Sequence, residues 1–242
     1  MDYQGRCIAE IGTNGTGKTH TAIEILKRGN VEVQKHFDVV LILVSDDSET
    51  ILKPYKEIKL TEVGKLSKGW VKLNVDDVDE VFKVLFDVWE NNQKINKNVA
   101  LLVDDAMAIL DTRNKWVMKF FKKRRQRNCD IIMNCHGASE YPRSLFKNTT
   151  DFLIFQTTDS LQEIEARMSR DLTNRLRLAV EYVNMVAANF QNTNNSLKYF
   201  RFLFSQKSPP EIEIIRKLIA SKWWHDEQKQ KIIINQLNKF QI

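Results

Sequence analysis

The segment that most constrains the fold is a glycine-rich run near the N-terminus. It reads Gly12-Thr13-Asn14-Gly15-Thr16-Gly17-Lys18-Thr19 and matches the pattern GxxxxGK followed by Ser or Thr at every fixed position. An apolar segment over residues 6–11 precedes it, and a helical segment over about 18–27 follows it. Glycines let backbone N–H groups converge on phosphate oxygens, and the helix N-terminus adds its dipole. The run therefore predicts a phosphate-binding loop between a strand and a helix.

Two side chains at the end of this loop have specific expected roles. Lys18 is placed to reach the β- and γ-phosphates of a nucleotide, and the Thr19 hydroxyl is placed to bind Mg²⁺. The residues expected to contact the nucleotide are Gly12, Thr13, Asn14, Gly15, Thr16, Gly17, Lys18, Thr19 and His20.

A second motif supplies the acids that such a loop needs. The apolar run Val99 to Val103 ends in Asp104 and Asp105, as expected at the end of a buried strand. Asp104 is predicted to hold Mg²⁺, and Asp105 to polarise the attacking water. Most ATPases of this type have Glu at the second place, so Asp105 is a departure, and another group could be the base.

The sequence favours ATP over GTP. Guanine-specific proteins usually carry an NKxD-like motif, and the nearest strings, Asn96-Lys97-Asn98-Val99 and Asn114-Lys115-Trp116-Val117, lack the Asp. ATP with Mg²⁺ is therefore the expected cofactor pair.

The rest of the chain alternates apolar runs with amphipathic segments. Residues 39–44, 71–75, 99–103, 131–135 and 152–155 are predicted strands, and 76–92 and 112–128 predicted helices. This alternation favours an α/β fold with a mostly parallel sheet flanked by helices. Residues 53–70 are expected to be irregular, 160–185 helical, and 197–204 a strand. The predicted division is a core over 1–206 and a helical extension over 207–242, which packs on the core or docks to a partner.

Composition narrows the class of protein. With 242 residues the chain has room for one α/β domain or one domain plus an appendage. Its apolar runs are short, so no membrane span is expected, and we find no signal peptide. Three cysteines without CxxC spacing argue against a disulfide framework or a four-ligand zinc site.

Positive charge is concentrated in one segment. The net charge is only +6, but eight Lys and Arg residues lie between Arg113 and Arg127. Such a run is either a solvated helix face or a surface for polyanions.

The order of these motifs resembles the FtsK–HerA superfamily of ring-forming, DNA-pumping ATPases. The resemblance rests on the phosphate loop, the acidic strand, an arginine-rich helix, and an apolar strand with the polar tip Asn134-Cys135-His136. It covers about residues 5–170. The small size and the segment from Tyr141 to Asp151 resemble the viral genome-packaging branch. The resemblance implies a P-loop NTPase of the additional-strand class (RecA- and FtsK–HerA-like), in which one strand lies between the phosphate-loop strand and the acidic strand.

The resemblance also implies function and partners. It implies ATP-driven translocation of double-stranded DNA into a capsid by a homo-oligomeric ring, contacts with a capsid or portal-vertex protein, and a location in the host cytoplasm or the virion. It implies that Asn134 or His136 senses the γ-phosphate and that an arginine acts on the neighbouring subunit's nucleotide. The arginine candidates are Arg124, Arg125 and Arg127, with Arg143 a weaker one. The remaining basic residues would contact DNA phosphates without reading sequence.

Three alternatives remain open from the sequence. A filamentous-phage assembly ATPase of the zonula-occludens-toxin type shares these motifs but normally carries a transmembrane helix. A small-molecule P-loop kinase would turn over as a monomer. A nucleotide-binding switch would bind without hydrolysing, which Asp105 and the arginines disfavour.

Overall fold

The fold is described from a computed structural model of the chain. It describes residues 5–29, 36–45, 50–92, 98–138, 140–159, 176, 179–180, 183–184 and 201–205. Most of the predicted helical stretch over 160–185, and all of the predicted extension over 207–242, lie outside these residues. The proposed boundary at 206/207 therefore stays a prediction.

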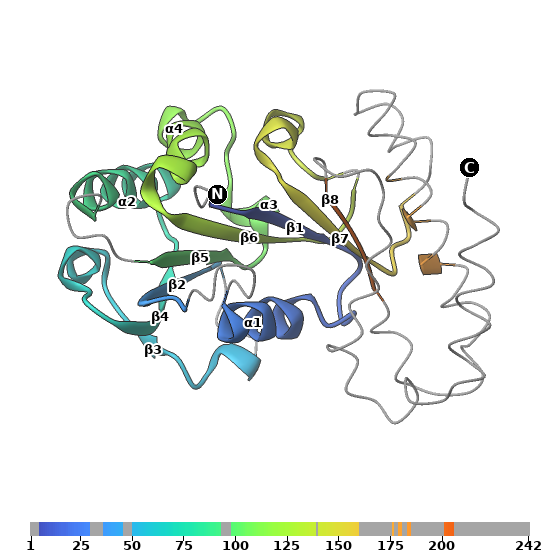
Figure 1. The fold of residues 1–242 in the computed structure, drawn as a ribbon, viewed down its shortest axis with the longest axis horizontal. Coiled ribbons are helices and arrows are strands. Elements are labelled where there is room, and N and C mark those ends of the chain that lie inside the picture. The colour runs from blue at the N-terminus through green and yellow to red at the C-terminus, as the bar shows by residue number, and fades with distance from the viewer. Residues whose placement is uncertain are drawn as a thin grey trace.

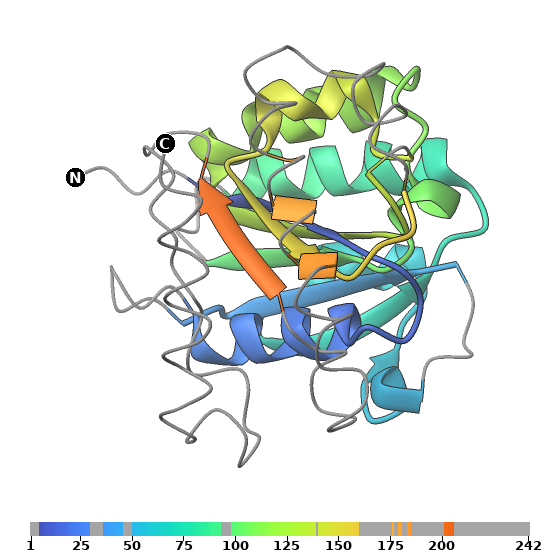
Figure 2. The same ribbon diagram turned by 90° about the vertical axis from the view of Figure 1, so that its right-hand side faces the viewer.

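The described residues form one eight-stranded sheet in the order β3-β4-β2-β5-β6-β1-β7-β8. The strands are β1 (Cys7–Ile11), β2 (Val39–Val44), β3 (Lys56–Glu57), β4 (Gly69–Asn74), β5 (Val99–Val103), β6 (Cys129–Cys135), β7 (Asp151–Phe155) and β8 (Arg201–Ser205). All neighbouring pairs are parallel except β7 and β8. Figure 2 shows β8 as the orange arrow at the edge of the sheet. The predicted mostly parallel α/β fold is confirmed.

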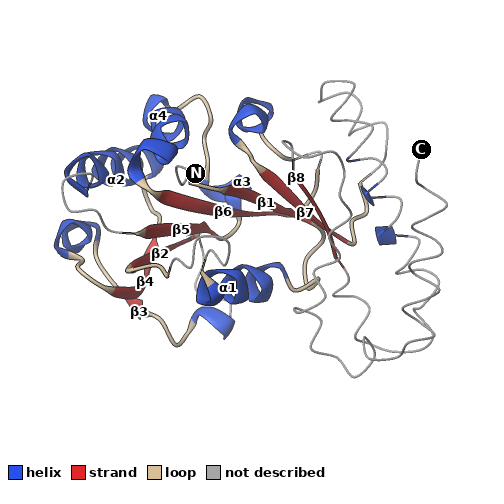
Figure 3. Ribbon diagram, in the orientation of Figure 1, coloured by secondary structure: helices blue, strands red, loops and turns tan. Residues whose placement is uncertain are grey.

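Helices cover both faces of the sheet. Figures 1 and 3 show α2 (Val78–Asn92) and α4 (Lys115–Lys123) on one face and α1 (Lys18–Arg28) on the other. One apolar cluster joins alternate residues of β1 to α2 and α4, and a second joins Ile8 to the buried side of α1. Burial on both faces is why the central strands are almost continuously apolar in sequence.

The position of β6 decides which residues can meet. β6 lies between β1 and β5, with Ile11 paired to Cys135 and Val103 paired to Met133. The predicted insertion of this strand between the phosphate-loop strand and the acidic strand is therefore confirmed. Because the three strands are parallel, their C-terminal ends open onto one edge of the sheet, where ligands bind in folds of this kind.

Some elements differ from the sequence expectation. The stretch expected to be irregular, 53–70, contains the short strand β3 and the 3-10 helix η3 (Leu60–Lys65). Both residues of β3 are exposed, so no apolar run marks it. The helix expected from 112 begins at Lys115, because the Asn114 side chain caps it by accepting from the Trp116 and Val117 N–H groups.

Candidate nucleotide-binding site

The glycine-rich run forms a loop between β1 and α1, as predicted. Gly15 and Gly17 have φ of 74° and 85°, a left-handed conformation that side chains disfavour. Gly17 is the N-cap of α1 and supplies no side-chain cap, and the first helical turn holds no acid. The backbone N–H groups at this end of the helix are thus left for an anion.

Lys18 lies inside the loop. Its side chain is buried, and its ammonium donates to the Gly12 carbonyl at 2.7 Å and the Thr13 carbonyl at 2.9 Å. These bonds hold a positive charge among the loop's backbone groups. Asn14, Gly15 and His20 are exposed, whereas Thr16 is buried and its hydroxyl donates to the Thr13 carbonyl at 2.8 Å.

Three polar side chains from different elements meet beside the loop. The Thr19 hydroxyl donates to Asp104 Oδ1 at 3.0 Å, and Asn134 Nδ2 donates to the same oxygen at 2.6 Å. Asn134 Nδ2 also lies 3.3 Å from Thr19 Oγ1. The structure therefore brings together the helix start, the residue after β5 and a residue of β6.

Burial and hydrogen bonding act in opposite directions on Asp104. Burial raises the pKa of its carboxyl, and the hydrogen bonds from Asn134 and Thr19 oppose the rise by favouring the carboxylate. Burial is the larger effect, so the pKa of Asp104 lies above its ordinary value.

The residues present fit Mg²⁺. A hydroxyl and a carboxylate 3.0 Å apart offer the oxygen ligands that this ion takes alongside substrate phosphates. The buried Asn134 Oδ1 has no hydrogen-bond partner among the described residues, so a further acceptor lies at the same place.

Asp105 has a backbone conformation that is uncommon for a residue with a side chain. Its φ is 57°, and its carboxylate caps α3 (Ala106–Ile109) by accepting from the Ala108 N–H at 3.4 Å. Its Oδ1 also lies 3.5 Å from His136 Nε2, and both side chains are more than a third exposed. Asp105 and His136 thus lie close together, and solvent can reach both.

A connection from β7 to the phosphate loop was not predicted from the sequence. The Gln156 carbonyl accepts from the Thr13 N–H at 2.9 Å and the Thr13 hydroxyl at 3.2 Å. The Gly12 N–H donates to the Cys135 carbonyl at 3.1 Å. The connection could have been predicted from the strand order, because Gln156 follows β7, which pairs with β1 and ends beside it.

Three of the arginine candidates, Arg124, Arg125 and Arg127, lie at the end of β6 opposite to the phosphate loop. The 3-10 helix η4 (Arg124–Arg127) precedes β6, so it sits at the strand's start, while the phosphate loop sits beyond the end of β1. Arg124 is 2% exposed and donates to the Phe121 carbonyl at 2.8 Å. A guanidinium held inside the core cannot reach a neighbouring chain, which removes Arg124 from the candidates. Arg125 is exposed.

Comparison with known proteins identifies the fold. No family model matches the sequence, and no curated protein matches it. Among solved structures, the genome packaging NTPase B204 from Sulfolobus turreted icosahedral virus 2, in complex with ATP-gammaS, aligns with a TM-score of 0.59 and 13% identity. The alignment covers 83% of this chain and 92% of that chain.

A second solved structure shows the same similarity of fold. The DNA-packaging ATPase B204 from Sulfolobus Turreted Icosahedral Virus aligns with a TM-score of 0.54 and 16% identity over 85% of this chain and 94% of that one. The N-terminal domain of zonular occludens toxin from Neisseria meningitidis aligns over 64% of this chain at a TM-score of 0.41. The two B204 alignments show that the chain has a P-loop NTPase fold, similar to that of the genome-packaging NTPase B204.

Proposed function

We propose that this chain is a Mg²⁺-dependent ATP hydrolase that moves double-stranded DNA, as part of viral genome packaging. The observation that carries the proposal is the contact of Asp104 with both Thr19 and Asn134. That contact exists because β6 lies between β1 and β5. It joins a phosphate-binding loop, an acid and a polar strand tip, which together can report whether a γ-phosphate is present.

Each residue has a role in this reading. Lys18 and the N–H groups of the loop bind the phosphates, and Thr19 with Asp104 would hold the metal. Mg²⁺, when bound, supplies positive charge that neutralises the phosphate oxygens. Asn134 orients Asp104 and Thr19, and would sense the γ-phosphate through them. Asp105, paired with His136, is the group that accepts a proton from the attacking water.

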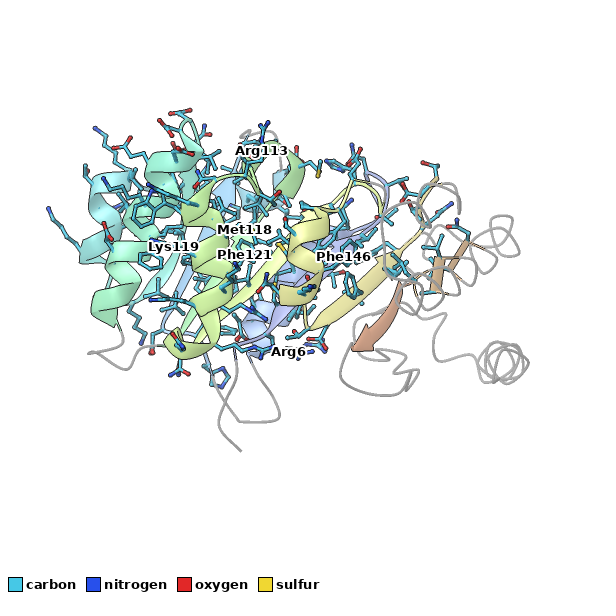
Figure 4. The ribbon with its side chains drawn as sticks, turned by 90° about the horizontal axis from the view of Figure 1, so that it is seen from above. Arg6, Arg113, Met118, Lys119, Phe121 and Phe146 are labelled. Atoms are coloured by element: carbon cyan, nitrogen blue, oxygen red, sulfur yellow. The ribbon has the colours of Figure 1, made fainter. Side chains whose placement is uncertain are left out.

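The proposed DNA partner is supported by the surface of α4. Figure 4 looks onto this helix, with Lys119 labelled. The Lys119 ammonium lies 4.7 Å from the centre of the Trp116 ring and 5.9 Å from that of Phe86. Within the described part of the chain, no carboxylate pairs with Lys115, Lys119 or Lys122, all of which are exposed. Cations without a carboxylate partner, at helical spacing along α4, suit phosphate contacts that carry no sequence information.

The ring, the capsid or portal partner and the trans arginine rest on the likeness of the fold to that of B204, which is described as a genome packaging NTPase. Arg125 is the arginine that fits best, because it is exposed while its neighbour Arg124 is buried. Arg125 lies before the start of β6, whereas the phosphate loop of the same chain follows the end of β1, so Arg125 can act only on the nucleotide of another subunit.

Hydrolysis is tested with two variants of the loop and the acid. Lys18→Ala should abolish nucleotide binding, whereas Asp104→Asn should keep binding and lose Mg²⁺-dependent release of phosphate. Binding is measured with a fluorescent ATP analogue and turnover by phosphate release. Full turnover by Asp104→Asn would overturn the assignment of the metal site.

DNA binding is tested on α4 with a matched control. The triple variant Lys115→Ala/Lys119→Ala/Lys122→Ala should bind duplex DNA more weakly. Its plot of log affinity against log salt should be shallower by about 3 if each lysine contacts one phosphate. The control replaces Lys59, Lys65 and Lys68, which are also exposed but lie around η3. Equal losses in the two variants would mean that only net charge matters, and would overturn the assignment to α4.

A further inference from the structure

The four residues after β7, Gln156 to Asp159, form what we call the β7 strap. At one end, the Gln156 carbonyl accepts two hydrogen bonds from Thr13 in the phosphate loop. At the other end, Asp159 contacts the loop that follows β6, residues 136–138. The strap therefore touches both sides of the candidate nucleotide site.

Asp159 holds the backbone of the loop after β6. Its Oδ2 accepts from the Ala138 N–H at 2.5 Å and from the Thr157 hydroxyl at 2.7 Å. Thr157 Oγ1 in turn accepts from the Asp159 N–H at 3.3 Å. The carboxylate is thus fixed by its own strap and fixes Ala138, four residues after Asn134.

Gly137 provides the space for this contact. A Cβ built on Gly137 would lie 2.5 Å from Asp159 Oδ1 and 2.9 Å from Oδ2. A side chain at 137 therefore requires the Asp159 carboxylate or the loop backbone to shift, which changes the geometry of their contact. The loop and the strap are therefore complementary at the level of single atoms.

The strap is itself fixed from its far side. Asn184 Nδ2 donates to the Thr157 carbonyl at 2.7 Å, and Asn184 Oδ1 accepts from the Thr157 N–H at 3.1 Å. With Thr13 on one side and Asn184 on the other, the strap is anchored independently of the loop after β6. The β7 strap can therefore fix the position of the loop after β6, because its own position does not depend on that loop.

We propose that Asp159 is a positioning residue for ATP hydrolysis, which it serves by holding the loop after β6. That loop carries His136, and Asn134, which lies in β6 two residues before His136, contacts Asp104. Without the Asp159 bond, the loop loses its fixed position relative to the phosphate loop. His136 and Asn134 then meet Asp105 and Asp104 less often in the reactive arrangement, whereas phosphate binding by the loop is unaffected. This inference rests on the proposed hydrolase function.

The test uses four variants of the contact and one control variant, all made in the full chain. Asp159→Ala removes the acceptor, and Asp159→Asn keeps a carbonyl oxygen that can accept from the Ala138 N–H. Gly137→Ala keeps the acceptor but displaces it. Gly137→Ala/Asp159→Ala combines both changes. Gly64→Ala is the control for adding a methyl group, because its Cβ would meet only Val88 at an ordinary 3.7 Å.

The expected results separate positioning from folding. Asp159→Ala and Gly137→Ala should each lower kcat about 10- to 100-fold with KM for ATP little changed. The double variant should be no slower than either single one, because both changes break the same contact. Asp159→Asn should recover most of kcat, and Gly64→Ala should match the wild type.

Three outcomes would overturn the proposal. The first is an unchanged kcat in Asp159→Ala, and the second is a loss of kcat in the double variant that equals the sum of the two single losses. The third is a loss of ATP affinity and of melting temperature in Asp159→Ala large enough to explain its lower activity. Failure of the proposed function is seen separately, because the wild-type chain would then release no phosphate at all.

Discussion

Asn134→Ala is the most informative single change at the site. The substitution removes Nδ2, which donates to Asp104 Oδ1 at 2.6 Å and lies 3.3 Å from Thr19 Oγ1. It leaves the phosphate loop, Lys18 and the backbone of β6 in place. The pKa of Asp104, already raised by burial, should rise further because the hydrogen bond that lowers it most is lost.

The expected magnitude follows from the kind of hydrogen bond removed. A hydrogen bond to a charged group contributes about 1.5–3 kcal/mol. If all of it is realised in the transition state, turnover falls about 10- to 150-fold, at about 1.4 kcal/mol for each factor of ten. ATP affinity should change little, because Asn134 touches the acid and the hydroxyl, not the loop N–H groups.

The assay compares kcat for phosphate release with the affinity for a fluorescent ATP analogue. Asn148→Ala is the control, because Asn148 lies on η5 (Arg143–Asn148) and, among the described residues, its side chain donates only to the Ser144 carbonyl. Wild-type kcat in Asn134→Ala would refute the reasoning. Loss of ATP binding without loss of kcat would refute it equally, because Asn134 would then stabilise bound ATP and not the transition state.

Three further predictions concern stability and reactivity. Burial raises the pKa of Cys7 from 9.0 to about 12, so the thiol of the folded chain should resist alkylation at pH 8 and react only in denaturant. Because the pKa is higher in the folded chain, the contribution of Cys7 to the free energy of unfolding is complete below pH 9 and is lost as the pH rises toward 12. Fast labelling of Cys7 in the native chain would contradict this. Arg124→Met should leave the melting temperature unchanged or raise it, because Arg124 Nε and Nη2 are buried without a partner in the described part of the chain; a drop of several degrees would reveal a partner. Tyr141→Phe should cost about 1 kcal/mol in chemical denaturation, since the Tyr141 hydroxyl bonds to Thr149 inside the core; no change would mean that the bond adds nothing.

Most of the sheet could be predicted because its strands are buried on both faces. Runs such as 39–44 and 99–103 are continuously apolar, and the glycine-rich loop fixes where the first strand ends. The contact of Thr19 with Asp104 followed from the motifs alone. β3 could not be predicted, because two exposed residues at the sheet edge leave no hydrophobic pattern.

Other parts of the site depended on tertiary contacts. Asp159 and Gly137 are 22 positions apart, and nothing in their neighbours indicates that they touch. Arg124 is different, because a signal was present. Val117, Phe120, Phe121 and Arg124 recur at helical spacing, and all four are buried. The basic run drew attention to charge, while the periodicity already placed Arg124 on the inner face.

The most direct test of the central claim is the rate of ATP hydrolysis per chain, measured against protein concentration with and without double-stranded DNA at low salt. A DNA-moving ring that uses a trans arginine predicts a rate that rises with concentration, rises again with DNA, and falls in Arg125→Ala. A rate per chain that ignores both concentration and DNA would contradict a ring translocase and favour a monomeric kinase, whose phosphate acceptor would then be sought.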